Sequence, residues 1–199
     1  MPNVWENSAL YTHYKVSTVS GTPLSVATDA SSSLTVDTLA YGPSDASFTR
    51  PADTTAYTAG DVVSNSTSAP TVLEFTSIGP AGGRVVLQSA SLRIDVATVP
   101  AGMSSFRLHL YTTSPTAIND NAAFNLPTAD RSKYVGYLEL ATPQDLGDTL
   151  WSQTDYIGLQ IKLASASTSL YGILETRGAF TPTSAAVKTL RLNALEVSQ

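Results

Sequence analysis

Histidine and cysteine, the side chains most often used as nucleophiles, general bases and metal ligands, are scarce in this sequence. It contains no cysteine and only two histidines, His13 and His109. His109 stands between Leu108 and Leu110, on the polar side of an alternating segment, and no second histidine is close enough in sequence to begin a recognisable zinc motif. We therefore interpret His109 as a hydrogen-bonding residue of a strand, and His13 as an interface residue.

Paired carboxylates are the next candidates for chemistry. Glu139 and Glu175 lie in predicted strands, and Asp145 and Asp148 could lie together on a turn, so the acid and nucleophile of a glycosidase are available by residue type. Glycosidases of this fold class have aromatic-lined clefts, however, and no predicted strand brings an acidic residue together with tryptophan. We therefore predict that the protein is not an enzyme and has no catalytic residues.

Two other motifs contain residue types found in calcium sites and phosphate-binding loops, but neither has the surrounding sequence that such a site requires. Residues 119–121, Asn-Asp-Asn, together with Asp130 offer oxygen ligands of the kind that calcium prefers, but the ordered spacing of a calcium loop is missing. Asn and Asp are also ordinary turn residues. The glycine-rich residues 79–83 join two predicted strands and open no helix, as a phosphate-binding loop would. We expect no metal and no cofactor.

Strands must position these side chains, because apolar and polar residues alternate through much of the chain. Within residues 84–111 the alternation occurs twice, around Leu92 and around Leu108, with a loop at Pro100 between the two segments. Further strands are predicted at residues 56–63, 72–76, 134–141, 157–163, 170–177 and 190–197. The last has a phase change at Asn193 and Ala194, which indicates a bulge.

The predicted fold is all-β, because no segment has a helical period over ten or more residues. About eight strands with long connections favour a two-sheet antiparallel sandwich, with a jelly roll as first choice and an immunoglobulin-like sandwich as second. Residues 112–133 form a connection of 22 residues. Loops of this length are commonly functional or pass from one sheet to another.

Composition excludes several classes of partner. The chain has 199 residues, 42% of them hydrophobic, a net charge of −5 and scattered basic residues. Nucleic acids and anionic membranes require clustered Lys and Arg, so neither is an expected partner. No apolar stretch approaches the roughly 20 residues that span a bilayer, and the N-terminus lacks the pattern of a secretory signal. We expect a protein made in the cytoplasm.

Residues 1–47 differ from the rest and are predicted to form an extended N-terminal arm, with the β-sandwich domain at residues 48–199. The arm is rich in Ser and Thr and has an aromatic cluster of Trp5, Tyr11 and Tyr14. A stretch of this composition buries too little apolar area to order by itself. It is either a flexible tail or, as we favour, an arm that docks these aromatic residues on a neighbouring subunit.

Five segments resemble a family of small virion proteins of tailed bacteriophages, over residues 48 to about 140. These segments are FTRPADTTAY (48–57), GDVVS (60–64), GG (82–83), PTAINDNAAF (115–124) and YVGY (134–137). The resemblance implies a structural virion component, most simply a capsid decoration (cement) protein of the jelly-roll type that forms homotrimers. It implies the major capsid protein as partner and the capsid surface as location, and it supplies no catalytic residues.

Two alternatives remain open at this stage. One is a component of the tail or baseplate. The other is a carbohydrate-binding or receptor-recognition module, because sugar sites on β-sandwiches use exposed aromatic side chains. The available residues are Tyr111, Tyr134, Tyr137, Tyr156 and Tyr171, although we expect several of these to lie in the core or in an interface.

Overall fold

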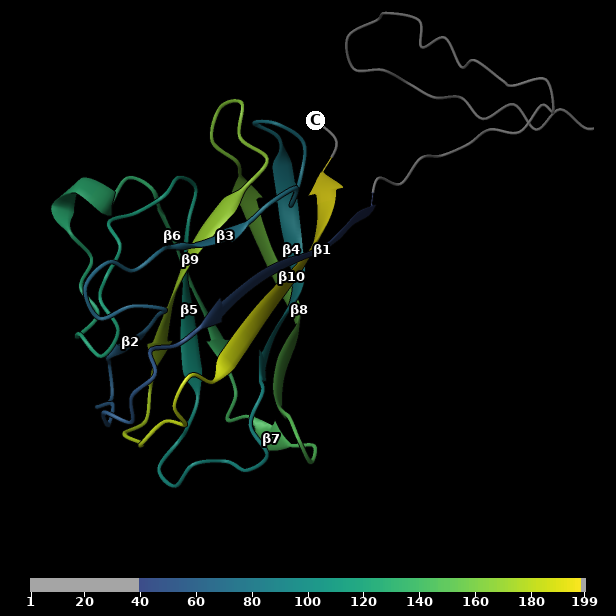
Figure 1. Ribbon diagram of the computed structural model, residues 1–199. Coiled ribbons are helices and arrows are strands. Elements are labelled where there is room, and N and C mark those ends of the chain that lie inside the picture. The colour runs from purple at the N-terminus through teal and green to yellow at the C-terminus, as the bar shows by residue number, and fades with distance from the viewer. Residues whose placement is uncertain (1–39, 198–199) are drawn as a thin grey trace, which may run out of the picture. The chain divides into compact units, whose positions relative to one another are not determined.

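Two antiparallel sheets packed face to face make up the computed structural model of the chain, which describes residues 40–197 (Figure 1). Ten strands and one 3-10 helix occur in this range. They are β1 (Ala40–Thr49), β2 (Val62–Val63), β3 (Leu73–Phe75), β4 (Arg84–Ile94), β5 (Phe106–Tyr111), η1 (Thr128–Asp130), β6 (Tyr134–Leu140), β7 (Gln144–Asp145), β8 (Leu150–Lys162), β9 (Leu170–Thr176) and β10 (Val187–Val197).

The strand order confirms the predicted all-β fold and its jelly-roll topology. One sheet has the order β1-β10-β4-β8-β7, and the other has the order β2-β9-β5-β6, with β3 also paired to β9. The first and last strands are therefore neighbours, and β2 and β3 act as two halves of one strand along β9. With β2 and β3 counted as one strand and the two-residue β7 set aside, each sheet has four strands, and this order and connection define a jelly roll.

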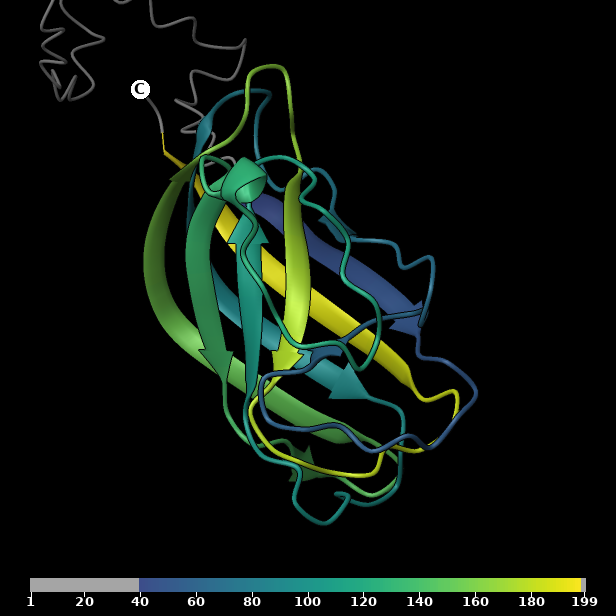
Figure 2. The same ribbon diagram turned by 90° about the vertical axis from the view of Figure 1, so that its left-hand side faces the viewer.

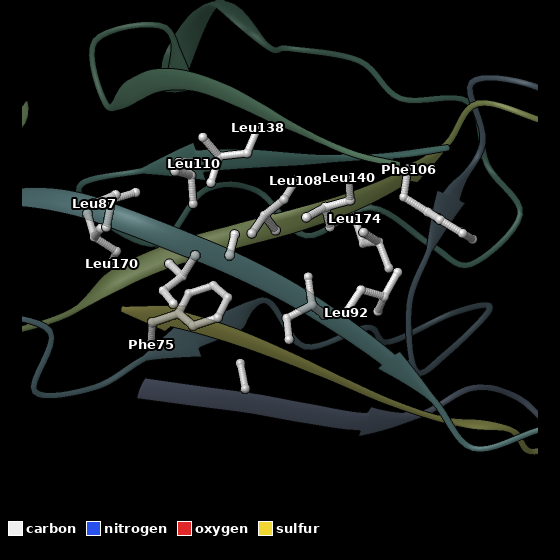
Figure 3. Packing of buried hydrophobic residues seen from close by; sticks show 14 of the residues in the cluster. Phe75, Leu87, Leu92, Phe106, Leu108, Leu110, Leu138, Leu140, Leu170 and Leu174 are labelled. Carbon is white, nitrogen blue, oxygen red and sulfur yellow. The ribbon is translucent and has the colours of Figure 1, made fainter. Parts of the chain in front are cut away.

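Alternating apolar side chains from both sheets fill the space between them (Figure 3). Phe106, Leu108 and Leu110 of β5 point inward and meet Leu87 and Leu92 of β4, and all five side chains are fully buried. The segment between β4 and β5 passes from one sheet to the other, because these strands lie in opposite layers. The alternation of apolar and polar residues in the sequence thus shows which face of each strand points into the core.

Hydroxyl groups close both open edges of the sandwich. At one edge, two hydroxyl groups of β8 donate hydrogen bonds of 2.7 Å to backbone carbonyl oxygens. Thr154 donates to Glu139 in β6, and Ser152 donates to Ala141 just after β6. At the other edge, Ser44 of β1 donates one of 2.7 Å to the carbonyl of Thr76. Each bond joins a strand of one sheet to the edge of the other sheet.

The strands of the structure differ from the predicted strands in two places. The first half of β8 was not predicted, because its inward positions hold Ser152 and Thr154 and the apolar alternation begins only at Ile157. Strand β1 begins at Ala40 and pairs with β10, so the predicted arm boundary at residue 47 falls inside this strand. The bulge predicted at Asn193 and Ala194 is confirmed as a register shift against β4.

The long loop of residues 112–133 folds over one sheet. It connects β5 and β6, which are neighbours in the same sheet, so the idea that it crosses between sheets is wrong. Instead, Ile118, Phe124 and Leu126 pack on Tyr111 and Ile173 of the outward sheet face, which Figure 2 views directly. The loop thereby forms a second, small hydrophobic cluster outside the sandwich.

Candidate functional site

The main candidate is a hollow on the outward face of the β1-β10-β4-β8 sheet. Its volume is about 120 Å³, and we call it the Trp151 hollow. It is lined by Asp45, Ser91, Arg93, Trp151, Thr189 and Arg191. These residues come from four different strands, so the backbone hydrogen bonds of the sheet fix their relative positions.

Strand register places the lining residues in two adjacent rows. Thr189, Arg93 and Trp151 are partners across β10, β4 and β8. In the neighbouring row Asp45, Arg191 and Ser91 are partners across β1, β10 and β4. Ser91 is small and buried, and it lies beside these long side chains, which explains why the sheet surface is hollowed at this point.

Hydrogen bonds hold the larger side chains of the hollow in place. The indole Nε1 of Trp151 donates to Oε1 of Gln153 at 3.3 Å, and Gln153 in turn donates to Asp155 at 2.8 Å. On the other side, Arg93 donates to the hydroxyl of Thr189 at 3.3 Å. The aromatic ring is therefore anchored through its edge to a row of polar side chains along β8.

The charges around the hollow neutralise one another. Arg191 donates two hydrogen bonds to Asp45, at 2.7 and 2.8 Å, and hydrogen bonding by Arg191 is the main reason that the pKa of Asp45 lies below its ordinary value. Arg93 donates to Asp95 at 2.9 Å. The hollow offers hydrogen-bonding groups and an aromatic side chain without a surplus of positive charge. These groups suit the hollow to binding a ligand.

Sequence reasoning missed the Trp151 hollow. No predicted strand held an acidic residue together with tryptophan, because the first half of β8 was not predicted. In the structure, β8 carries both Trp151 and Asp155, and Asp45 of β1 lines the hollow with Trp151. Trp151 and Asp45 occupy outward positions of β8 and β1, two segments that the alternation did not identify as strands. Their proximity depends on the order of strands in the sheet, for which the sequence carries no local signal.

Tyr156 is the most exposed large hydrophobic residue in the described part of the chain. Its side chain is 96% exposed, and its backbone has φ of 57°, a left-handed conformation that is costly for a bulky residue. It lies in a bulge of β8, where residues 156–158 oppose a single residue of β4. A strained, fully exposed tyrosine on a rigid strand is a candidate contact for a partner.

On the opposite sheet, His109 is enclosed by its neighbours. Its ring lies 3.6 Å from that of Phe124, centre to centre, in a stacked arrangement, and only 3% of the residue is exposed. Nε2 lies 2.7 Å from Glu175 and Nδ1 lies 3.0 Å from the hydroxyl of Tyr134. The structure confirms His109 as a hydrogen-bonding residue of a strand, and both ring nitrogens are engaged.

The two glutamates of the glycosidase hypothesis lie on this second sheet with a cation between them. Arg107 is the register partner of both Glu139 and Glu175, and it donates to Glu139 at 2.7 Å. Glu175 also accepts a hydrogen bond of 2.6 Å from Arg177. Burial raises the pKa of Glu175, but the hydrogen bonds with His109 and Arg177 together lower it by more. The pKa of Glu175 therefore lies below its ordinary value. Glu175 is therefore not held in the protonated form that a general acid requires.

A third group of polar residues is buried beneath the loops, and we call Arg50, Tyr57 and Asp120 the buried clamp. The guanidinium of Arg50 donates to Asp120 at 3.3 Å and to the hydroxyl of Tyr57 at 3.2 Å. The Tyr57 hydroxyl donates to Asp120 at 2.7 Å, and the backbone N–H of Ser64 donates to the same carboxylate at 2.8 Å. Burial raises the pKa of Tyr57, so its hydroxyl keeps its proton.

Lys188 lies near the buried clamp and is itself almost fully buried. Burial, followed by the charge of Arg50, lowers the pKa of its amine to about 8. Although such an amine is more nucleophilic than an ordinary lysine, only 1% of the residue is exposed. A substrate would have no access to it.

The calcium hypothesis is not supported by the arrangement of its residues. Asp120 belongs to the buried clamp, whereas Asp130 accepts hydrogen bonds from Lys133 and from the backbone of Thr116. Asn121 has φ of 61°, which is typical of a turn. Across residues 40–197, no three acidic or histidine side chains are grouped in a way that could hold a metal ion.

The remaining candidates divide between the core, the surface and the part of the chain that is not described. Tyr111 is buried, as expected for some of the tyrosines, whereas Tyr137 is about half exposed. Trp5, Tyr11 and Tyr14, the predicted assembly contacts, lie outside the described residues, as does His13. In the described range, no helix has the length and apolarity to cross a membrane.

Comparisons with known proteins assign no family to the chain. No protein-family model matches it, and no curated protein does. Among solved structures, it is similar to a chain of the heated full particle of Israeli acute paralysis virus, with 14% identity, a TM-score of 0.31, and coverage of 94% of this chain and 84% of that chain. A crystal structure of the same virus gives 10% identity, a TM-score of 0.29, and coverage of 100% and 83%.

A third similar structure is a Clostridium thermocellum endo-1,4-β-D-xylanase fragment in complex with xylohexaose. It has 12% identity and a TM-score of 0.29, and the match covers 82% of this chain and 28% of that chain. Likenesses of this strength carry no assignment of function to the present protein, which therefore rests on its own residues.

Proposed function

We propose that this chain is a structural protein of a tailed-bacteriophage virion, and specifically a decoration protein that binds the head shell through its major capsid protein. The observation that supports this proposal concerns the segments that resemble such proteins. FTRPADTTAY, GDVVS and PTAINDNAAF supply Arg50, Tyr57, Ser64 and Asp120, which meet in one buried hydrogen-bonded network. The resemblance thus covers residues that act together in the fold rather than scattered matches.

The same network supports a structural role for these segments. Residues 48–64 and 115–124 are far apart in sequence, and the buried clamp ties them together beneath the surface. Backbone hydrogen bonds reinforce the connection, from Val62 to Ala122 at 2.8 Å and from Phe124 to Gly60 at 2.8 Å. A decoration protein needs loops that stay folded on a particle exposed to the environment, and this arrangement provides them.

In this proposal the contacts with the particle come from exposed residues of the jelly roll and from the N-terminal arm. Tyr156 and the exposed Leu195 are available on the sheet that contains β8 and β10. Trp5, Tyr11 and Tyr14 serve as arm anchors, and homotrimers place several weak contacts on the lattice at once, which raises the effective concentration. A tail or baseplate location is the main alternative.

The test uses virions of the phage that encodes the chain, with its gene deleted and then with purified protein added back. We expect saturable binding to heads, visible by electron cryomicroscopy at symmetric positions, and better survival of heating and osmotic shock. The triple change of Trp5, Tyr11 and Tyr14 to Ala should reduce occupancy while the circular dichroism spectrum stays unchanged. Density confined to the tail would overturn the head assignment, and absence from the particle would overturn the virion assignment.

A further inference from the structure

We propose that the Trp151 hollow is a binding site for an uncharged oligosaccharide, with the indole of Trp151 as the stacking platform. This inference does not depend on where in a virion the protein sits. It follows from the shape, the charge and the side chains of the hollow, and from the polar row that continues from it along β8.

The shape and size of the hollow suit a small ligand. The space in it that a ligand could fill is about 120 Å³, less than the roughly 300 to 1,000 Å³ of enclosed ligand pockets, so it suits a ligand that lies across an open surface. All six lining residues stand on strands, so the site is formed before the ligand arrives and little ordering is needed on binding. Ser91 forms a low floor between longer side chains, which leaves room for a ring to approach the indole.

The side chains match the chemistry of a sugar ring. A pyranose has an apolar face of C–H groups, which stacks on an aromatic ring, and a rim of hydroxyl groups, which both donate and accept hydrogen bonds. Trp151 offers the aromatic surface, and its edge is fixed by the bond to Gln153. Arg93 and Arg191 offer donors in a planar fork, Asp45 offers acceptors, and Thr189 offers a hydroxyl.

The charge balance argues for an uncharged ligand. Arg191 is paired with Asp45 through two hydrogen bonds, and Arg93 is paired with Asp95. A phosphate or sulfate would have to compete with these carboxylates, and no lysine lines the hollow to favour it. Hydroxyl groups can instead accept from the guanidinium groups and donate to Asp45 without displacing the ion pair.

The surroundings allow a ligand longer than one sugar. Gln153 and Asp155 are exposed and follow Trp151 on the same face of β8, while Asn193 donates a hydrogen bond of 2.7 Å to Ser89 in the next row. Amide and hydroxyl groups therefore extend the polar surface beyond the hollow, across β10, β4 and β8. An oligosaccharide lying across the strands would meet hydrogen-bonding groups along its length.

The experiment uses the full chain with Trp5→Phe, because the protein has two tryptophans and this change leaves Trp151 as the only one. Maltohexaose, cellohexaose and chitohexaose are titrated while tryptophan fluorescence is recorded, and affinities are measured by calorimetry. We expect a saturable change in Trp151 emission with at least one of the three. Trp151→Ala should weaken its binding by about tenfold or more, because it removes a large stacked aromatic surface.

Matched variants separate binding from folding. Trp151→Phe keeps an aromatic ring and should retain part of the affinity, and thermal melting verifies that each variant is folded. Tyr137→Ala is the control, because Tyr137 is an exposed aromatic residue beside Arg107 on the opposite sheet, and it should leave the affinity unchanged.

Four outcomes would overturn the proposal. The first is the absence of a saturable signal with all three saccharides. The second is an affinity that folded Trp151→Ala retains. The third is stronger, salt-dependent binding to heparin, which would show an anion site. The fourth is a loss of head binding by Trp151→Ala in a protein that binds none of the sugars, which would identify the hollow as a protein contact.

Discussion

The outward faces of the two sheets differ in how far loops cover them. Residues 112–133 cover part of the face of the β2-β9-β5-β6 sheet, where the outward residues Tyr111, His109 and Ile173 are buried. The face of the β1-β10-β4-β8 sheet keeps exposed charged residues such as Arg93 and Arg191 and contains the Trp151 hollow. Both faces carry aromatic residues and arginine–carboxylate pairs, so residue type alone does not separate them.

This difference shows that a polar residue on a strand contributes to structure where a loop covers it, and can contact a ligand or a partner where it stays exposed. On the covered face, His109 is stacked on Phe124 and bonded on both nitrogens, so it contributes to structure. On the open face, Arg191 and Trp151 remain partly accessible, so they can meet a ligand or a partner. The buried clamp sustains this asymmetry, because Asp120 lies in the covering loop.

Removing the acidic member of the buried clamp is the strongest way to break this asymmetry. Asp120→Ala leaves Arg50, which is 2% exposed, without its buried carboxylate partner. We expect the free energy of unfolding to fall by about 3 to 5 kcal/mol, as measured by urea denaturation. Asp148→Ala changes an exposed carboxylate on a turn and serves as the control, with no change expected. A loss below about 1 kcal/mol for Asp120→Ala would show that the clamp does not hold the loop.

Uncovering His109 is the next test. Phe124→Ala removes the stacked ring and should lower the free energy of unfolding by about 2 kcal/mol. It should also raise the pKa of His109 toward its ordinary value, because burial is the main cause of its lowered pKa. Histidine NMR signals would measure this change, and Phe124→Leu, which keeps the cover, is the control. An unchanged His109 pKa in Phe124→Ala would contradict the role of the loop.

The same residue predicts how the stability of the wild-type chain depends on pH. The pKa of His109 is lowered in the folded state, so the unfolded chain takes up its proton first as the pH falls. Stability is then full above the ordinary histidine pKa and decreases as the pH falls through it. The lowered pKa of Glu175 adds a further loss in the more acidic carboxylate range. Denaturation midpoints between about pH 8 and pH 4 should show this decline, and a flat profile would contradict it.

On the open face, a change at Tyr156 should not lower the free energy of unfolding, in contrast to the changes at Asp120 and Phe124. Tyr156→Gly relieves a left-handed backbone conformation at a side chain that is 96% exposed. We expect the free energy of unfolding to stay the same or to rise by up to about 1 kcal/mol. Tyr156→Ala keeps the strained backbone and is the comparison. A clear loss of stability for the glycine variant would mean that Tyr156 packs within the protein.

The smallest effect is expected at the rim of the Trp151 hollow. Arg191→Ala removes a solvent-exposed pair with Asp45 and should lower the free energy of unfolding only slightly, by an amount that decreases with added salt. Thermal denaturation at low and high salt would measure it. A loss comparable to that of Asp120→Ala would show that the open face is as important to the fold as the covered one.

The candidate sites were only partly accessible from the sequence. His109 was identified as a hydrogen-bonding strand residue because its neighbours Leu108 and Leu110 alternate with it. The burial of His109 could not be foreseen, because Phe124 lies in a connection without periodicity. Likewise, Arg50 and Asp120 are 70 residues apart, and nothing near either residue indicates that they meet.

The sequence by itself determined the local features of this protein. Alternation with a period of two specified most strands, the face that each presents to the core and the bulge of β10, because these depend on neighbours within a few residues. Only the tertiary structure decided that β4 lies between β10 and β8, that residues 112–133 cover one sheet and that Trp151 lies beside Arg93. The physical reason is that strand order and register are fixed by the packing of the whole core, which joins residues far apart in the chain.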